Sequence, residues 1–199
     1  MRMTRGRPID FDKIQFVFLD RDGVLNEKPA FGGYITNSSD FRLLQGVGPA
    51  VAALNRSGRT VIVVTNQRGI ALGLFTQDNL LDIHQKLQRG LAAFGAHLDG
   101  IYFCPHDAGQ CRCRKPMTGM FEQAAADFPA AGPHNSIMIG DSLRDIEAGK
   151  TWGMATVFVT GDHDLSDDKR KAASLADDCV LSLAELVNEY VRPHIPDQS

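Results

Sequence analysis

Residues 14–26 read IQFVFLDRDGVLN, an apolar run that ends at two aspartates separated by one arginine. The run 14–19 is nearly continuous in apolar side chains, which is typical of a parallel strand covered on both faces. We therefore expect a buried strand here, and further strands at the similar runs along the chain. These runs are 61–64 (VIVV), 101–103 (IYF), 136–139 (SIMI), 155–159 (ATVFV) and, more weakly, 179–181.

Amphipathic segments separate the apolar runs. Apolar residues recur at helical spacing from Leu80 to Phe94 and from Phe121 to Phe128, where Thr118 is a candidate N-cap. Strands that alternate with helices in this way predict an α/β fold with a doubly wound parallel sheet.

Length and charge narrow the class of protein. The chain has 199 residues and a net charge of −3, so no broad basic surface favours nucleic acid. No apolar stretch approaches the roughly 18 residues of a membrane span. The N-terminal segment lacks the apolar block of a secretory signal. We expect one cytoplasmic domain over residues 1–199, without a cap domain and monomeric, since nothing in the sequence forces a dimer.

Polar residues follow each of the first four expected strands. Ligands bind beyond the carboxyl ends of the strands in sheets of this kind, so these side chains are expected to converge at one edge. The segments that follow the strands are Asp20-Arg21-Asp22, Thr65-Asn66-Gln67, Arg114-Lys115 and Asp141-Ser142-Leu143-Arg144-Asp145.

Asp20 and Asp22 are the first candidates for chemistry. Two carboxylates one residue apart in a strand point the same way and repel each other unless a cation lies between them. Mg²⁺ prefers such oxygen ligands and leaves room for a substrate phosphate. Taken alone, the pair also fits a strand end followed by an Asp-Gly turn.

The other polar positions have plain alternatives too. Thr65 fits a polar exit from a buried strand, Lys115 a solvated loop lysine, and Asp141 with Asp145 a helix cap and a surface acid. Placed together on one sheet edge, they form a phosphoryl-transfer site, in which Lys115 neutralises charge on the nucleophile and the phosphate.

A second constellation lies after the third expected strand. Cys104, His106, Cys111 and Cys113 supply three thiolates and one imidazole within ten residues. This donor set predicts tetrahedral Zn²⁺ with no open position for catalysis, and so a structural zinc loop over residues 104–113. The alternative, small core cysteines beside a loop histidine, is disfavoured because the segment is rich in Pro, Gly, Asp and Arg.

The ordered set DRDGV, TNQ, RKP and GDSLRD resembles the four motifs of the haloacid dehalogenase superfamily of phosphatases. The resemblance implies that Asp20 is a nucleophile that forms an aspartyl-phosphate, and that Asp22 is the general acid and base. It also implies that Thr65 and Lys115 stabilise the phosphoryl group. Mg²⁺ would bind to Asp20, to the backbone carbonyl of Asp22 and to Asp141.

Longer segments resemble one family within it, the D-glycero-D-manno-heptose 1,7-bisphosphate phosphatases. These segments are DRDGVLN, TNQRGIALGLFT and CPHDAGQCRCRKPMTGM. The resemblance implies a phosphorylated sugar of the cell-envelope heptose pathway as substrate, with the phosphate removed at C7. The substrate contacts that it implies are Lys28, Phe31, Asn66, Gln67 and Arg114.

Two alternatives stay open. Histidinol-phosphate phosphatases share the zinc loop, DRDG and RKP, and the short loop between His106 and Cys111 is closer to theirs. Two further positions, Leu72 and Ser142, differ from the arginine and lysine usual in the heptose enzymes. The other alternative is a non-catalytic, zinc-stapled phosphoryl-binding module, which the complete set of catalytic residue types disfavours.

Overall fold

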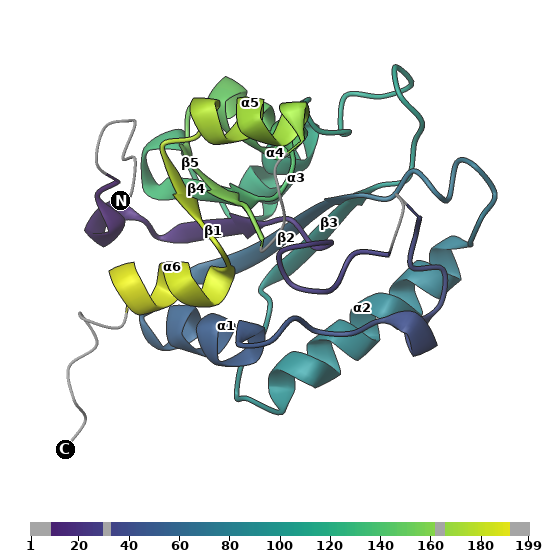
Figure 1. The fold of residues 1–199 in the computed structure, drawn as a ribbon, viewed down its shortest axis with the longest axis horizontal. Coiled ribbons are helices and arrows are strands. Elements are labelled where there is room, and N and C mark those ends of the chain that lie inside the picture. Colours follow the sequence, from purple (N-terminus) through teal and green to yellow (C-terminus); the bar gives the residue numbers. More distant parts are fainter. Residues whose placement is uncertain (1–8, 30–32, 162–165, 192–199) are drawn as a thin grey trace.

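The computed structural model describes residues 9–29, 33–161 and 166–191 (Figure 1). Within them lies a six-stranded sheet of order β3-β2-β1-β4-β5-β6, in which every neighbouring pair is parallel. The strand order winds outward in both directions from β1, so the predicted doubly wound sheet is confirmed. The strands are β1 Phe16–Leu19, β2 Thr60–Asn66, β3 Gly100–Cys104, β4 Ser136–Gly140, β5 Ala155–Val159 and β6 Asp178–Val180.

The central strand shows why its sequence is apolar throughout. All four residues of β1 are buried, because helices cover the sheet on both faces. Val17 and Leu19 belong to one core cluster, whereas Phe16 and Phe18 belong to another. Successive side chains of a strand point to opposite faces, so both faces of the sheet need apolar residues.

Figure 1 shows α1, α2 and α6 on one face of the sheet and α3, α4 and α5 on the other. The helix α5 lies in a polar segment for which no helix was predicted. Thr118 directly precedes α3 as expected, but its hydroxyl donates to Glu122 rather than capping the helix. The helices are α1 Val47–Arg56, α2 Gln77–Ala92, α3 Gly119–Asp127, α4 Leu143–Trp152, α5 Asp167–Leu175 and α6 Leu183–Tyr190; the 3₁₀ turns are Phe11–Lys13, Ser38–Asp40 and Pro133–Asn135.

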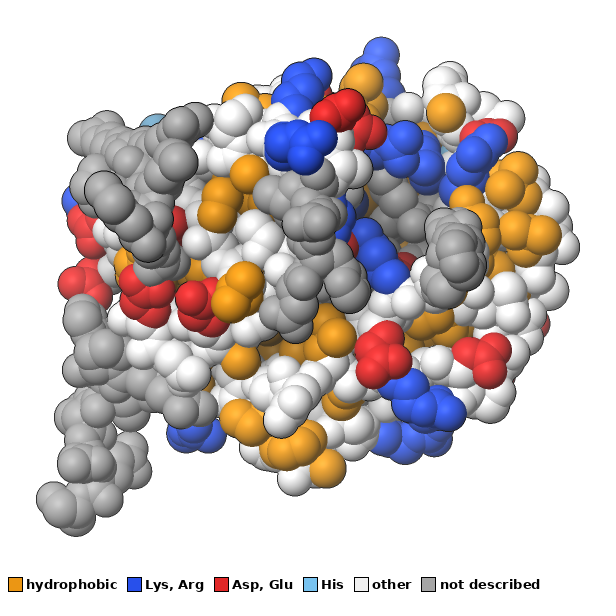
Figure 2. All heavy atoms as spheres, viewed as in Figure 1, with side chains coloured by type: hydrophobic (Ala, Val, Ile, Leu, Met, Phe, Trp, Pro, Cys, Tyr) orange, Lys and Arg blue, Asp and Glu red, His pale blue; other side chains and the backbone are white. Residues whose placement is uncertain are grey.

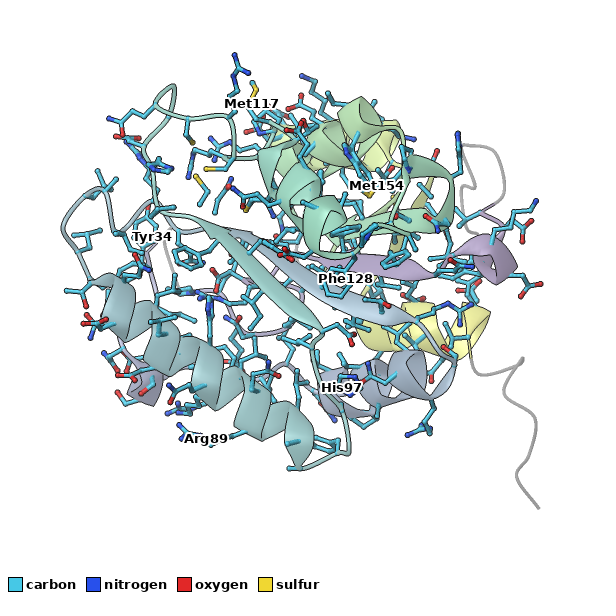
Figure 3. All side chains as sticks on the ribbon, turned by 180° about the vertical axis from the view of Figure 1, so that it is seen from behind. Tyr34, Arg89, His97, Met117, Phe128 and Met154 are labelled. Atoms are coloured by element: carbon cyan, nitrogen blue, oxygen red, sulfur yellow. The ribbon has the colours of Figure 1, made fainter. Side chains whose placement is uncertain are left out.

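The parallel register brings the carboxyl ends of the strands to one edge. Leu19, at the end of β1, is level with Val63 of β2 and Ile139 of β4. Figure 3 shows Tyr34 and Met117 at this end of the sheet. In the described parts of the chain, only short elements join β1 to β2 and β3 to β4, so the expected absence of a cap domain is confirmed. The same parts contain no helix long and apolar enough to cross a bilayer.

Candidate active site

Asp20 directly follows β1 and lies at the floor of the site. Its backbone N–H donates to Ile139 O at 2.9 Å, which extends the pairing between β1 and β4 by one residue. Burial raises the pKa of the carboxyl to about 7; Lys115 opposes the rise, and the nearby Asp145, Asp141 and Asp22 add to it. A buried carboxylate among others of like charge needs cations around it.

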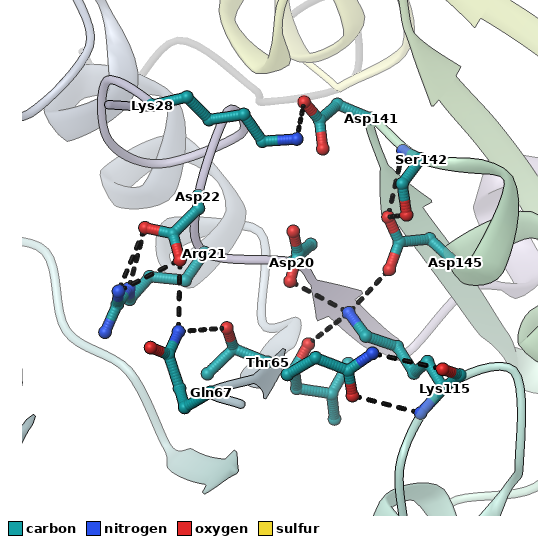
Figure 4. Close-up of polar contacts among 12 residues, drawn as sticks. Asp20, Arg21, Asp22, Lys28, Thr65, Gln67, Lys115, Asp141, Ser142 and Asp145 are labelled. Atoms are coloured by element: carbon teal, nitrogen blue, oxygen red, sulfur yellow. Dashed lines mark hydrogen bonds and ion pairs between the residues drawn. The ribbon is translucent and has the colours of Figure 1, made fainter. Parts of the chain in front are cut away.

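Lys115 supplies one of those cations (Figure 4). Its side chain is only 2% exposed, and Nζ donates to Asp20 Oδ1 at 2.8 Å, Asp145 Oδ1 at 2.5 Å and Val64 O at 2.6 Å. Burial lowers its pKa, but the two carboxylates outweigh that effect and the pKa is raised. An ammonium has three donors, and here each has an acceptor, so the lysine is fixed and charged.

Asn66 fixes the backbone of Lys115. Its side-chain amide donates to Lys115 O at 3.1 Å and accepts from Lys115 N at 3.0 Å. This pair of hydrogen bonds ties the loop after the cysteine cluster to the end of β2, and so places the lysine over the sheet edge.

Asp22 lies beside Asp20, but its carboxylate faces other partners. Arg21 grips it through Nε at 3.2 Å and Nη2 at 2.9 Å to each oxygen, while Asn26 Nδ2 donates at 2.9 Å and Gln67 Nε2 at 3.0 Å. Burial raises the pKa of Asp22, but the charge of Arg21 and the hydrogen bonds together lower it by more, so the pKa lies below its usual value. The expectation that both carboxylates face one cation is therefore wrong for the side chain of Asp22, because Arg21 neutralises it.

Two glycines allow the acidic residues to come together. Gly23 has φ of +91°, and a Cβ there would lie 2.2 Å from Asp141 Oδ2. A Cβ on Gly140 would lie 2.2 Å from the Cβ of Asp145. Any larger residue at either position would push an aspartate out of the site.

Asp20, Asp141 and Asp145 form the carboxylate group of the site, with ligand oxygens within 4.8 Å of one another. Asp141 Oδ1 is buried without a hydrogen-bond partner, while Lys28 Nζ lies 2.5 Å from Oδ2. An unpartnered buried oxygen beside two further carboxylates suits a hard divalent cation. Asp145, from the GDSLRD motif, completes the group, but its two oxygens already accept from Lys115 and Ser142.

A cavity of about 310 Å³ opens above these groups. Figure 2 shows Lys and Arg side chains gathered around a hollow on this face. Of the predicted substrate contacts, Lys28, Asn66 and Arg114 line the cavity, whereas Gln67 is buried beneath it and Phe31 is outside the described residues. Thr65 also lines it, and its hydroxyl accepts from Gln67 at 2.9 Å. Tyr34, Arg68 and Arg144 also line the cavity, although none of them was among the predicted substrate contacts.

The predicted zinc ligands come together next to this cavity. Cys104 Sγ lies 3.5 Å from Cys111 Sγ and 3.7 Å from His106 Nδ1, and Cys113 Sγ lies 3.3 Å from both Cys111 Sγ and His106 Nδ1. Sulfur ligands about 2.3 Å from a tetrahedral Zn²⁺ are separated by about 3.8 Å. The four donors therefore have nearly the spacing of a tetrahedral site.

The profile of HAD-hydrolase-like proteins matches residues 112–186. The D-glycero-beta-D-manno-heptose-1,7-bisphosphate 7-phosphatase of Haemophilus ducreyi is 39% identical over 181 residues, 86% of this chain and 97% of the relative. The chain belongs to the heptose 1,7-bisphosphate phosphatase family. A Mycobacterium tuberculosis relative, a D-glycero-alpha-D-manno-heptose-1,7-bisphosphate 7-phosphatase, is 40% identical over 132 residues, 66% of this chain and 69% of the relative.

Solved structures agree with this assignment to the heptose bisphosphate phosphatases. The crystal structure of D,D-heptose 1,7-bisphosphate phosphatase from B. bronchiseptica, complexed with magnesium and phosphate, is similar with a TM-score of 0.77 and 31% identity. The match covers 90% of this chain and 99% of that one. The resemblance found in the sequence is confirmed, and this family member is a phosphoric monoester hydrolase.

The motif resemblance set two residues, Leu72 and Ser142, apart from the heptose enzymes. Leu72 is 44% exposed and does not line the cavity. Arg68 lines it instead and pairs with Asp107 of the cysteine loop at 2.5 Å, so a guanidinium is present four residues earlier in the chain. Ser142 lines the cavity and donates to Asp145 through its hydroxyl at 2.6 Å and its backbone at 3.0 Å.

Proposed function

We propose that this protein removes the C7 phosphate of D-glycero-D-manno-heptose 1,7-bisphosphate through an aspartyl-phosphate on Asp20. The observation that carries the proposal is the buried ion pair between Asp20 and Lys115 at the base of the cavity. It presents a carboxylate as nucleophile with a fixed cation beside it, where charge develops during phosphoryl transfer.

In the first half-reaction, a carboxylate oxygen of Asp20 attacks phosphorus and forms an O–P bond. The bond between phosphorus and the sugar oxygen breaks, and Asp22 gives that oxygen a proton. Thr65 and Lys115 stabilise the transferring phosphoryl group. The lowered pKa of Asp22 means that the carboxyl must gain its proton when the anionic substrate binds close to it.

In the second half-reaction, Asp22 takes a proton from water. The water oxygen attacks phosphorus, the bond from phosphorus to Asp20 breaks, and inorganic phosphate leaves. Asp22 is then protonated and ready for the next substrate.

Asp20 and Asp141, together with the backbone carbonyl of Asp22, are the residues proposed to hold Mg²⁺, and Asp145 stands next to them. Bound Mg²⁺ would neutralise phosphate oxygens and hold them in line with the nucleophile. The unpartnered Asp141 Oδ1 supports this assignment, as does the magnesium in the B. bronchiseptica relative.

The rim of the cavity suits a substrate with a second phosphate. Arg68, Arg114 and Arg144 all line it, and Arg114 Nη1 is buried without a partner. Guanidinium groups bind phosphate through paired hydrogen bonds. Lys28 and Asn66 are proposed sugar or phosphate contacts at the same rim, with Phe31 and Gln67 kept as expectations from the resemblance.

Zinc is proposed as the structural metal of residues 104–113. Four protein ligands fill a tetrahedral shell, so the ion would stabilise the loop that carries Arg114 and Lys115 without binding water. Cysteines without disulfide bonds suit a reducing compartment, which supports the expected cytoplasmic location. We further propose that the chain is a single domain and a monomer. Light scattering in solution measures the molar mass and so tests the oligomeric state.

A phosphate-release panel tests the substrate. It contains both anomers of the heptose bisphosphate, the corresponding heptose 1-phosphate and 7-phosphate, and histidinol phosphate. We expect the highest kcat/KM with a heptose bisphosphate and retention of the C1 phosphate in the product, observed by ³¹P NMR. A higher kcat/KM for histidinol phosphate would overturn the sugar assignment, and no turnover of any ester would favour the binding module.

A further inference from the structure

Arg21 is the largest fully buried side chain in the part of the chain that the structure describes. A guanidinium without water must have its donors satisfied by the protein. Nε and Nη2 donate to Asp22, and Nη1 lies 3.4 Å from His84 Nε2. Arg21 therefore has one partner at the cavity and another on the helix α2.

His84 is fitted to its role as the acceptor. The residue is 6% exposed, and its ring packs edge-on against Phe103, with ring centroids 6.0 Å apart. A cationic imidazole would repel Arg21, whereas a neutral one can accept a hydrogen bond from it. Burial is the main effect that lowers the pKa of His84 to about 3, and the charge of Arg21 lowers it as well, so the ring is neutral. On the same helix, Ile83 and Leu87 lie in the core, so the ring is held from a rigid element.

We propose that His84 and Arg21 are a buried pair of positioning residues that fix the direction of the Asp22 carboxylate for proton transfer to the leaving oxygen. The inference rests on the proposed function, because that function assigns the proton transfer to Asp22. Arg21 supplies three of the five side-chain hydrogen bonds to the Asp22 carboxylate, and Asn26 and Gln67 supply one each.

The grip matters because proton transfer depends on direction. A carboxylate turns freely about its last torsion, whereas two guanidinium donors from one rigid plane hold both of its oxygens. A misplacement of about 1 Å costs on the order of 10²-fold in rate. Without the ring of His84, Nη1 would be a buried donor lacking an acceptor, and the guanidinium would shift to find one.

The leaving group provides the test. An alkoxide needs a proton as it departs, whereas p-nitrophenolate is stable without one. We compare kcat/KM for the alkyl phosphate that the wild-type protein hydrolyses fastest with kcat/KM for p-nitrophenyl phosphate, at saturating Mg²⁺. The change in this ratio from wild type to variant reports the proton transfer, because the other differences between the two esters are the same in every variant, and the comparison stays meaningful even where the sugar assignment is wrong.

His84→Leu removes the acceptor and leaves both charges of the Arg21–Asp22 pair in place. We expect it to lower the alkyl-to-aryl ratio about tenfold, and Arg21→Met about 10²-fold, as expected for a displaced general acid. His84→Gln retains an acceptor oxygen and should restore the ratio to within about threefold of wild type. The core variant Phe18→Leu is the matched control, which lowers thermal stability without changing the ratio.

Asp22→Asn separates this inference from the proposed function. It should lower the ratio most, and adding Arg21→Met to it should lower the ratio no further, because both act through one carboxyl. An unchanged ratio in His84→Leu and in Arg21→Met, with a lowered ratio in Asp22→Asn, would overturn the positioning pair and leave the acid in place. An unchanged ratio in Asp22→Asn would overturn the acid itself.

A crystal structure of His84→Leu gives a readout that does not depend on activity. We expect the Asp22 carboxylate to be rotated or in more than one conformer, whereas a carboxylate unmoved from its wild-type position would contradict the inference.

Discussion

Lys115 Nζ lies 2.8 Å from Asp20 Oδ1, although 95 positions separate the two residues in the sequence. The sheet explains the approach, since β1 ends at Leu19 and Lys115 is tied by Asn66 to the end of the neighbouring strand β2. The nucleophile and its cation therefore belong to different segments of the chain, and each can be altered separately.

Replacing Asp20 by Asn should abolish turnover while the fold and the zinc content stay unchanged. An amide cannot attack phosphorus to form the acyl-phosphate. We expect phosphate release below about a thousandth of the wild-type rate, in line with the loss of a catalytic group. Asp40→Asn, at an exposed position, is the control and should keep full activity. A residual rate above that limit would show that Asp20 is not the nucleophile.

Lys115→Met should destabilise the metal-free protein strongly. It leaves Asp20 and Asp145 buried without their cation, for which we expect a loss of about 3–5 kcal/mol in the free energy of unfolding. Lys150→Met breaks a half-buried pair with Asp177 and should cost about 1 kcal/mol or less. Urea unfolding of both variants measures the difference. An equal loss of unfolding free energy in the two variants would show that the buried cation of Lys115 is not needed to stabilise the fold.

Removing Mg²⁺ with a mild chelator should stop turnover reversibly and leave zinc bound. Asp20 and Asp141 would lose the cation that balances them and the phosphate. Adding Mg²⁺ back should restore the rate, whereas Ca²⁺, which prefers longer bonds and more ligands, should not. Phosphate release and metal content are measured on the same sample. Activity without any divalent ion would exclude the proposed carboxylate site.

Cys113→Ser should lose zinc and most of the activity but little secondary structure. A hydroxyl replaces one thiolate of the set, and the loop that directs Arg114 and Lys115 is released. We expect a fall in rate on the order of 10²-fold. Metal content per chain, circular dichroism and X-ray absorption measure the three effects. A native site with three protein ligands and one water would contradict the structural role.

The pH dependence of stability should report His84. Its pKa is about 3 in the folded protein, below the ordinary value of 6.5, so between these values the unfolded chain binds more protons. Stability from this residue is thus fully present above pH 6.5 and falls by about 1.4 kcal/mol for each pH unit below it. Urea unfolding at pH 7 and pH 5 should show a smaller loss in His84→Gln than in wild type. His97→Gln, at an exposed position, should keep the wild-type loss.

The doubly wound parallel sheet and the edge that carries the site were predictable, because they follow from the apolar runs and from the rule that parallel strands end together. Asp20, Thr65, Lys115 and Asp141 meet for that reason. The direction of the Asp22 side chain was not predictable, because it depends on Arg21, whose partner His84 lies on a helix distant in sequence. Short-range sequence patterns cannot show that the arginine between these two aspartates is buried.

Two other differences have similar causes. Gln67 follows Asn66 in the sequence, but it lies just beyond the end of β2 and is buried below the cavity, where its side-chain amide donates to Asp22 and Thr65. The helix α5 has only Ala172 buried among its nine residues, so its sequence carries almost no amphipathic signal.

The side chain of Asn66 has a consequence for how such enzymes diversify. Because this amide anchors the Lys115 backbone directly to the sheet, the exposed turn from Ala108 to Gln110 is not needed to hold the lysine in place. Residues can be inserted or exchanged in that turn while the catalytic cation keeps its place. The turn is therefore a place where a longer loop could be grafted without displacing the catalytic cation from the sheet edge.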